Sequence, residues 1–450
     1  MPDIEVKLGI EAYASKTPGI GGLIRVSNED FIVEEILTDG SIASVDTNPP
    51  QTPFALDRYV ICLLIKNGWE TISAVRRIAE ALNIPVDQIG FAGLKDAQAL
   101  TGQYISIGGV SPKKISDLRL NDDVRVYPVK SSSEKISPKN LFGNRFRINV
   151  RSIKCHITTT SKRIEKIKRE LDDFGGIPNF FGHQRFGTVR PITHLVGYLL
   201  LRNEWERAAL LYLSSTSPYE SHNVSEARRY LQDTRDFRGA LKLFPRRLVY
   251  ERLMLTHLAK YPGDFLGAFR RLPREIRVIF IHAYQSFLFN RFLSERMKRS
   301  IPLREVQEGD YVVILDDKGL PTGNYEKTMA SNITRIRDGV EKGRMAVCLP
   351  LPGFRRCFSG GIQGEIENDV LEEEGVTHES FRVEKMLEIS AAGGFRRALS
   401  PILNFHAPGE VDRETREVKV HFSFTLQKGS YATVVLREFM KPKFPVEAGF

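Results

Sequence analysis

Cysteine and tryptophan are scarce in this chain of 450 residues, which contains four cysteines and two tryptophans. No two cysteines form a C-x-x-C pair, and the last two lie too far apart in the sequence for the common zinc-ligand spacing. We therefore predict no metal site. Because free cysteine is usually buried, all four are expected to be reduced and structural. They are Cys62, Cys155, Cys348 and Cys357.

Long apolar runs are also absent, since no segment approaches the roughly 18 uninterrupted apolar residues of a transmembrane helix. The first sixteen residues, MPDIEVKLGIEAYASK, include acidic residues and have no apolar core of the kind found in a signal peptide. A cytoplasmic location and no membrane partner are therefore expected. There is no internal repeat and no low-complexity tract.

Basic residues, in contrast, are in excess: 65 Lys and Arg against 55 Asp and Glu give a formal net charge of +10. The excess is clustered, because residues 151–170 hold seven bases and two acids, and residues 223–252 hold eight bases and four acids. One acidic stretch, residues 364–388, lies apart from them. The pattern favours a polyanionic partner such as nucleic acid, although solvated helix faces would also explain it.

Apolar periodicity predicts sheet regions near both ends of the chain and helices between them. Alternating or β-branched runs predict strands, and a 3.6-residue period predicts helices. From about 190 to 300 the pattern is helical, and one run, EIRVIFIHAYQSFLFNRFL, is apolar on nearly every side, as in a buried core helix. Strands are expected at 31–36, 58–66, 144–150, 418–426 and 431–438, and helices at 71–83 and 160–174. This order suggests one sheet domain interrupted by an insertion, although three consecutive domains would give the same pattern.

The stretch GFAGLKDAQALTGQ, residues 90–103, combines glycines, apolar residues and an adjacent Lys95 and Asp96. A structural ion pair is one explanation. The other is a nucleophilic carboxylate, which must be ionised, rigidly held and close to a cation. Packing by Phe91 and Leu94 would supply the rigidity, and the glycines would let a planar substrate approach the backbone.

A second loop, PNFFGHQRFG at residues 178–187, follows a helix end and interleaves phenylalanines with amide and basic side chains. Such a mixture suits a nucleobase that is stacked and hydrogen-bonded. For Phe180 and Phe186, anchoring of the loop on the core is an equally simple explanation.

These stretches resemble the TruD family of pseudouridine synthases. FAGLKDAQALTGQ is similar to the family's catalytic motif F/Y-A-G-x-K-D-x-x-A-x-T-x-Q, and PNFFGHQRFG is similar to P-N-Y/F-F-G-x-Q-R-F-G. EDFIVEE resembles the N-terminal D-F-x-V-x-E, and KGSYATVVLRE resembles the C-terminal G-x-Y-A-T-x-V-L-R-E. The four matches follow the family's order and span nearly the whole chain.

The resemblance implies an α+β fold: a pseudouridine-synthase catalytic domain, with a mixed, largely antiparallel sheet and flanking helices, interrupted by an inserted α/β TRUD domain. The expected parts are residues 1–189 and 389–450 for the catalytic domain and 190–388 for the insertion. The implied activity is isomerisation of uridine to pseudouridine in tRNA, at position 13, without cofactor or metal. No protein partner is implied, and a monomer is expected.

The resemblance also assigns roles to residues. Asp96 matches the nucleophile, which would attack C6 of uracil or C1′ of the ribose of a nucleotide flipped out of its helix. Phe181 matches the aromatic that stacks on the target base, and Asn179 the amide near the catalytic Asp. Arg25 falls where many members have lysine. The remaining expected substrate-binding or supporting residues are Glu35, Lys95, Gln103 and Arg185.

This sequence departs from the family pattern in three places. Ala97 and Gln98 stand where many members have basic residues, which puts the RNA footprint in question. Arg25 keeps the charge of lysine without its geometry, and Phe180 lacks the hydroxyl of tyrosine. Two alternatives are a non-catalytic RNA-binding protein on the same scaffold and an unrelated enzyme with an Asp96 nucleophile. The second usually needs a metal-binding acidic cluster or a second carboxylate.

Overall fold

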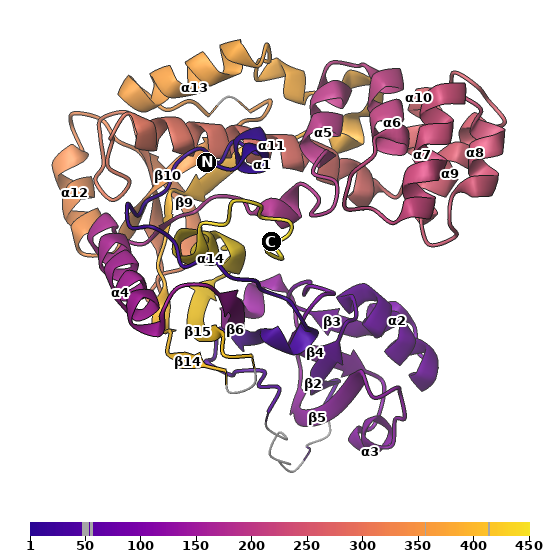
Figure 1. The fold of residues 1–450 in the computed structure, drawn as a ribbon, viewed down its shortest axis with the longest axis horizontal. Coiled ribbons are helices and arrows are strands. Elements are labelled where there is room, and N and C mark those ends of the chain that lie inside the picture. Colours follow the sequence, from indigo (N-terminus) through magenta and orange to yellow (C-terminus); the bar gives the residue numbers. More distant parts are fainter. Residues whose placement is uncertain (47–53, 55–56, 356, 413–414) are drawn as a thin grey trace.

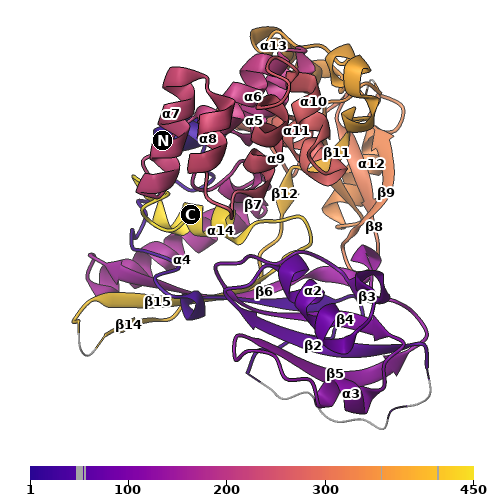
Figure 2. The same cartoon turned by 90° about the vertical axis from the view of Figure 1, so that its right-hand side faces the viewer.

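The computed structural model describes residues 1–46, 54, 57–355, 357–412 and 415–450. Two sheets organise these residues. A nine-stranded sheet is formed by the first and last parts of the chain, and a four-stranded sheet by the middle. Figures 1 and 2 show helices and the four-stranded sheet grouped on one side of the large sheet.

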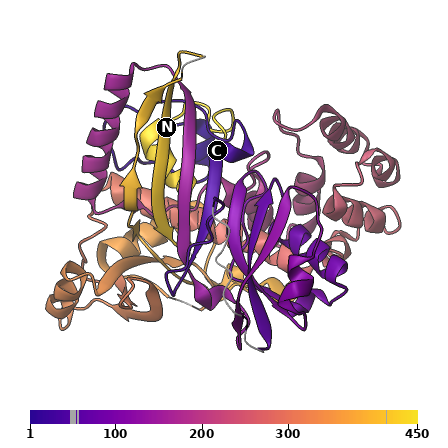
Figure 3. The ribbon, with the colours of Figure 1, turned by 90° about the horizontal axis from the view of Figure 1, so that it is seen from below.

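The nine-stranded sheet has the strand order β13-β15-β6-β1-β4-β2-β5, with β14 beside β15 and β3 beside β4. Its pairings are antiparallel except for the parallel pair of β1 and β4. Figure 3 shows the late strands lying directly beside the early ones. The strands are β1 Phe31–Leu37, β2 Tyr59–Asn67, β3 Ile89–Phe91, β4 Leu100–Gly108, β5 Val124–Ser132, β6 Leu141–Ile153, β13 Leu403–His406, β14 Gly409–Val411 and β15 Val418–Gln427.

The helices α2 (Thr71–Leu82) and α4 (Ile157–Phe174) pack beside this sheet, at the positions that periodicity predicts. Val75, Ile78 and Leu82 bury one face of α2, whereas Ile72 is 43% exposed. α4 ends at Gly175, whose φ of 95° is easily adopted by glycine. The short helices are α1 Asp3–Lys7 and α3 Pro112–Ser116.

The middle of the chain forms a helical layer followed by the four-stranded sheet. The sheet order is β11-β10-β8-β9, and all its pairings are antiparallel. The apolar run predicted as a core helix is confirmed as α11 (Arg274–Lys298), which is largely buried. The other elements are α5 Thr193–Leu201, α6 Trp205–Ser214, α7 His222–Thr234, α8 Phe237–Leu243, α9 Val249–Leu258, α10 Phe265–Arg270, β8 Tyr311–Leu315, β9 Pro321–Lys327, α12 Ile333–Glu341, β10 Met345–Leu351, α13 Gly361–Glu373 and β11 Gly394–Arg397.

The acidic stretch lies partly on α13, and its carboxylates serve the fold. Asp369 pairs with Arg299 at 2.8 Å, and Glu374 pairs with Arg291 at 3.1 Å, so the acids hold α13 against α11 and the turn after it. Glu367 is buried, and burial raises its pKa to about 7. Among the described residues, no group of three His, Cys, Asp or Glu side chains is placed to hold a metal ion.

The predicted last strand is wrong: after the turn at Lys428 and Gly429, residues Ala432–Met440 form the helix α14. Its β-branched run favours a strand by propensity. However, every residue of α14 is buried, and β15 already lies between β6 and the strands β13 and β14. Both edges of β15 are therefore occupied, and a helix that is apolar on every side can be buried in the core instead. Tertiary packing overrides the local propensity of this segment.

The chain leaves the four-stranded sheet after β11 and pairs β12 (Leu399–Ser400) with β7 (Ile177–Pro178) before it returns to the large sheet. The domain boundaries at 189 and 388 remain predictions. The four cysteines all lie within the described residues and are free, with Cys62 and Cys348 buried. No helix in the described part of the chain is long and apolar enough to span a membrane.

Candidate active site

Asp96 lies in the loop between β3 and β4, and its carboxylate is 44% exposed. The two strands flanking this loop pair with one another, so its ends are fixed by the large sheet. Leu94 is 65% exposed and Phe91 half-buried, so the expectation that both residues pack the loop is wrong for Leu94. The rigidity of the loop has another origin, in the polar contacts described next.

Lys95 and Glu35 form an ion pair at 2.7 Å in which both side chains are almost fully buried. The second carboxylate oxygen of Glu35 accepts a hydrogen bond from the backbone N–H of Tyr104 at 3.0 Å. The pair therefore ties the loop to β1 and β4 at once. Lys95 is therefore structural and points into the protein, whereas its neighbour Asp96 keeps its carboxylate accessible.

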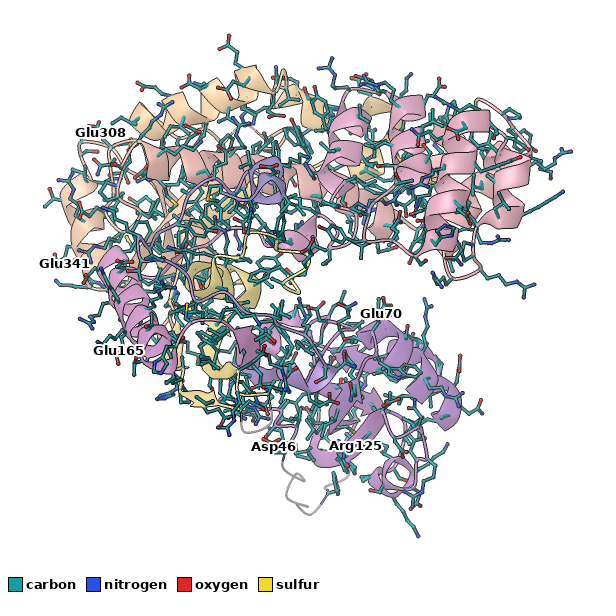
Figure 4. The ribbon with its side chains drawn as sticks, in the orientation of Figure 1. Asp46, Glu70, Arg125, Glu165, Glu308 and Glu341 are labelled. Carbon is teal, nitrogen blue, oxygen red and sulfur yellow. The ribbon has the colours of Figure 1, made fainter. Side chains whose placement is uncertain are left out.

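Three further side chains hold the backbone of the loop. Thr71 accepts a hydrogen bond from the Lys95 N–H at 3.0 Å and donates one to Gln103 at 2.9 Å. The Lys66 ammonium donates to the carbonyl of Asp96 at 3.1 Å and to that of Trp69. Burial lowers the pKa of Lys66 to about 8. The negative charge of Asp96 and, to a smaller extent, that of the exposed Glu70, labelled in Figure 4 at the start of α2, partly oppose this lowering of the Lys66 pKa.

Arg25 supplies the cation that faces the Asp96 carboxylate. Its Nη2 lies 2.8 Å from the Asp96 Oδ2, and its Nη1 donates to the carbonyl of Gly449 at 2.8 Å. The guanidinium also lies 4.1 Å from the centre of the Phe31 ring. Burial lowers the pKa of Arg25, and the charge of Asp96 opposes that shift. With φ at 56°, Arg25 occupies the left-handed region, a strained conformation that often marks a functional site.

Asn179 and Phe181 belong to a second group, on the loop that follows β7. The Asn179 side chain accepts a hydrogen bond from Arg396 at 2.7 Å and donates one to the carbonyl of Arg397 at 3.1 Å. The guanidinium of Arg396 lies 4.0 Å from the centre of the Phe181 ring. Burial lowers the pKa of Arg396 to about 10. Sequence reasoning missed Arg396, because nothing in GGFRRALS distinguishes it from the many other arginines.

The ring of Phe181 is 8% exposed and is held edge-on by Phe289 and Tyr431, with centroid distances of 5.5 and 6.2 Å. Arg185 lies 5.6 Å from the same ring and donates a hydrogen bond to Ser286 at 3.0 Å. The neighbouring Phe180 and Phe186 are buried and anchor the loop, as the packing explanation for them predicts.

The structure thus places the expected site residues in two groups. Arg25, Glu35, Lys95 and Gln103 surround the Asp96 loop, and Asn179, Phe181 and Arg185 lie with Arg396. Within the residues that the structure describes, no hydrogen bond, ion pair or ring contact joins the two groups directly. The last residues of the chain connect them: Gly449 contacts Arg25, and the Phe450 ring lies 6.0 Å from the ring of His183, in the Phe181 loop.

The basic clusters of the sequence are only partly available to a ligand. Arg228 is buried and pairs with Glu220 at 3.0 Å and Glu251 at 2.9 Å, so it stabilises the helical layer. Arg228 therefore contributes to the net charge without being free to contact RNA phosphates. In α4, Lys168 pairs with Asp172 at the surface of the helix.

The exposed carboxylate, the guanidinium beside it and the mixed, largely antiparallel sheet beneath them agree with the pseudouridine-synthase catalytic domain that the sequence resemblance implies. Comparison with known proteins specifies the class further. Residues 7–439 match the family model "tRNA pseudouridine synthase D (TruD)". The chain belongs to this TruD family.

Similar proteins cover nearly the whole chain. A probable tRNA pseudouridine synthase D from Methanosarcina mazei is 39% identical over 442 residues, covering 98% of both chains. One from Thermococcus gammatolerans is 39% identical over 433 residues, covering 95% of this chain and 97% of that one. A crystal structure of the putative tRNA pseudouridine synthase D from Methanosarcina mazei superposes with a TM-score of 0.82 at 38% identity, covering 99% of both chains.

Proposed function

We propose that this protein isomerises uridine to pseudouridine in tRNA, at position 13, with Asp96 as the nucleophile. One observation carries the assignment of Asp96: its carboxylate is exposed and faces a buried guanidinium, while Lys95, Thr71 and Lys66 fix the rest of its loop. A carboxylate held in this way can attack a substrate without reorganising first. Membership of the TruD family supplies the reaction class.

The reaction replaces the bond between C1′ of the ribose and N1 of the uracil by a bond between C1′ and C5. The Asp96 carboxylate attacks C6 of the uracil or C1′ of the ribose, and the bond between C1′ and N1 breaks. The freed uracil turns within the site, and C5 bonds to C1′. The aspartate is released, and the proton lost from C5 is balanced by a proton gained at N1, so that the product is an isomer of the substrate. No cofactor is required. Because neither atom is accessible in a stacked helix, the nucleotide must be flipped out, at a cost of a few kcal/mol.

The neighbouring residues have distinct roles in this proposal. Arg25 orients the carboxylate and keeps it ionised, since an adjacent cation favours the charged form. Glu35, Lys95 and Gln103 hold the loop. The pair formed by Arg396 and Phe181 receives the base, because guanidinium and aromatic faces both stack on nucleobases. Asn179 positions Arg396. Arg185, held by its hydrogen bond to Ser286, lies beside the Phe181 ring and supports it. A cytoplasmic location and a monomeric state remain predictions.

The test is a map of pseudouridine in unmodified tRNA transcripts incubated with purified protein, read by carbodiimide-dependent primer extension. Asp96→Asn is run in parallel. Asp87→Asn, which changes an exposed carboxylate elsewhere in the same part of the chain, is the matched control. A stop at position 13 that disappears only with Asp96→Asn supports the proposal. Tight tRNA binding without any stop would instead favour a non-catalytic RNA-binding protein.

A further inference from the structure

The four-stranded sheet of the middle region carries a row of aromatic side chains on one face. Its register places Tyr311 opposite Cys348 and Tyr325 opposite Val313, and residues directly opposite one another share a face. The Phe395 ring lies between the two tyrosines, with centroid distances of 4.4 Å to Tyr311 and 4.7 Å to Tyr325. The three rings therefore form one continuous aromatic surface.

This surface ends in an exposed ring. Tyr325 is 41% exposed, and its strand β9 is at the edge of the sheet, where it pairs with β8 alone. Packing explains Phe395, which has a ring on each side, but it leaves part of Tyr325 open to solvent. Open faces of small antiparallel sheets with two or three aromatic side chains are a recurrent surface for stacking RNA bases.

A small cavity lies beside the exposed ring, between the two sheets. Its volume is about 150 Å³. That is well below the roughly 300–1,000 Å³ of sites for drug-sized ligands, so the cavity suits a small group. The lining residues are Asn179, Val313, Pro321, Tyr325, Phe395, Arg396, Arg397, Leu399, Ser400, Gln427, Lys428 and Ser430.

The polar part of this lining suits an anionic nucleotide. Three lining residues are cationic, Arg396, Arg397 and Lys428, and none is acidic. Arg397 donates through Nη1 to Gln427, another lining residue, at 2.7 Å, so its guanidinium is held in place. Base carbonyls and phosphate oxygens are the acceptors that guanidinium and ammonium groups bind.

The cavity adjoins the proposed uridine site. Asn179 lines the cavity and also holds Arg396, whose guanidinium covers Phe181. A base in the cavity would therefore lie near the target uridine, and a nucleotide that flanks the target along the strand is the simplest source of that base. The cavity also joins the two sheets, since Tyr325 and Phe395 come from the middle region and Lys428 and Ser430 follow β15.

We propose that Tyr325, Phe395 and this cavity bind one nucleobase of the RNA substrate that flanks the target uridine, and so contribute to the choice of site. The base stacks on the exposed Tyr325 ring, and Arg397 and Lys428 contact its polar edge or the adjoining phosphate. This proposal rests on the proposed function, because it takes the RNA substrate from it.

The first experiment compares wild-type protein with Tyr325→Ser on tRNA transcripts. We expect KM to rise about ten-fold, because one base stacked on an aromatic side chain contributes that order of affinity, while kcat changes less than two-fold. Tyr219→Ser is the matched control, since Tyr219 is 42% exposed and lies outside the cavity. Equal KM values for Tyr325→Ser and the wild type would overturn the proposal.

The second experiment identifies the base, using RNAs that carry one abasic nucleotide at each position flanking the target. At one position, removal of the base should raise KM for the wild type but not for Tyr325→Ser, since the two changes remove the same contact. An equal effect of Tyr325→Ser on every abasic RNA would show that the tyrosine contacts no particular base and would overturn the proposal.

Equilibrium binding separates this proposal from the proposed function. The same RNAs are titrated against Asp96→Asn protein with and without Tyr325→Ser. A ten-fold loss of affinity that vanishes at one abasic position supports the base site even if no pseudouridine forms. Unchanged affinity would refute the base site while leaving the reaction at Asp96 unaffected.

Discussion

Lys95 and Glu35 form a 2.7 Å ion pair from which water is almost completely excluded. Removal of one partner leaves an unpaired buried charge, which costs about 3–5 kcal/mol of folding free energy. We expect Lys95→Met and Glu35→Gln each to lower the free energy of unfolding by about this amount in chemical denaturation. The double variant should be more stable than the sum of the two single effects predicts. Strict additivity would contradict the pairing.

Arg25 should affect the chemical step more than substrate binding. Its guanidinium bridges the Asp96 carboxylate and the Gly449 carbonyl, which a single ammonium group cannot do in the same way. We expect kcat to fall about ten-fold in Arg25→Lys and about 100-fold in Arg25→Met, because misplacement of a reacting group by about 1 Å costs that order. Single-turnover pseudouridine formation measures the effect. Arg77→Lys, on the exposed face of α2, is the control, and wild-type kcat in Arg25→Met would contradict the role.

Gly449 tests whether the last residues of the chain position Arg25. A Cβ at this glycine would lie 2.2 Å from the Ile24 carbonyl oxygen, and its φ of +92° disfavours any side chain. We therefore expect Gly449→Ala to lower kcat about ten-fold by displacing the carbonyl that Arg25 contacts. Gly109→Ala is the matched control, because Gly109 also has a positive φ but has open space around it. If both variants lose the same activity, the cause is backbone strain in general.

His183 should make the fold sensitive to acid. Burial lowers its pKa from 6.5 to about 4, so the unfolded chain binds a proton between these values and the folded chain does not. The stability of the fold is therefore unaffected by this titration above pH 6.5 and falls as the pH drops toward 4. The difference between the two pKa values corresponds to a loss of roughly 3 kcal/mol in the free energy of unfolding. His183→Gln should show a smaller loss of unfolding free energy over this range, whereas His222→Gln, at an exposed histidine, should behave as wild type.

The sheet and most helices could be predicted from the sequence because their signals are local. The alternation Val418, Val420, Phe422 predicts β15, and the period of α11 predicts a buried helix. The conformation of residues 432–440 could not be predicted, since their β-branched composition favours a strand, and the distant elements that bury α14 on every side are brought together only by folding.

The candidate site was predictable where a motif spans it and unpredictable where folding assembles it. Asp96, Lys95 and Gln103 lie within one stretch of sequence. Lys66 and Arg396 reach their loops from distant elements, and neither has a local signal that sets it apart from the other bases of the chain. The only local indication that Lys66 has a structural role is its position near the end of an otherwise apolar strand. A charge buried at such a position needs a polar partner.

The pairing of β15 with β6 has a consequence for the order of synthesis. β6 leaves the ribosome long before β15, and the whole helical layer is made between them. Helices with mainly local contacts fold early, whereas pairing across so long a separation waits for the second strand. Until β15 emerges, one edge of β6 is an unprotected sheet edge on the nascent chain. The edge that completes the catalytic sheet is therefore also the one most exposed to misassembly during translation.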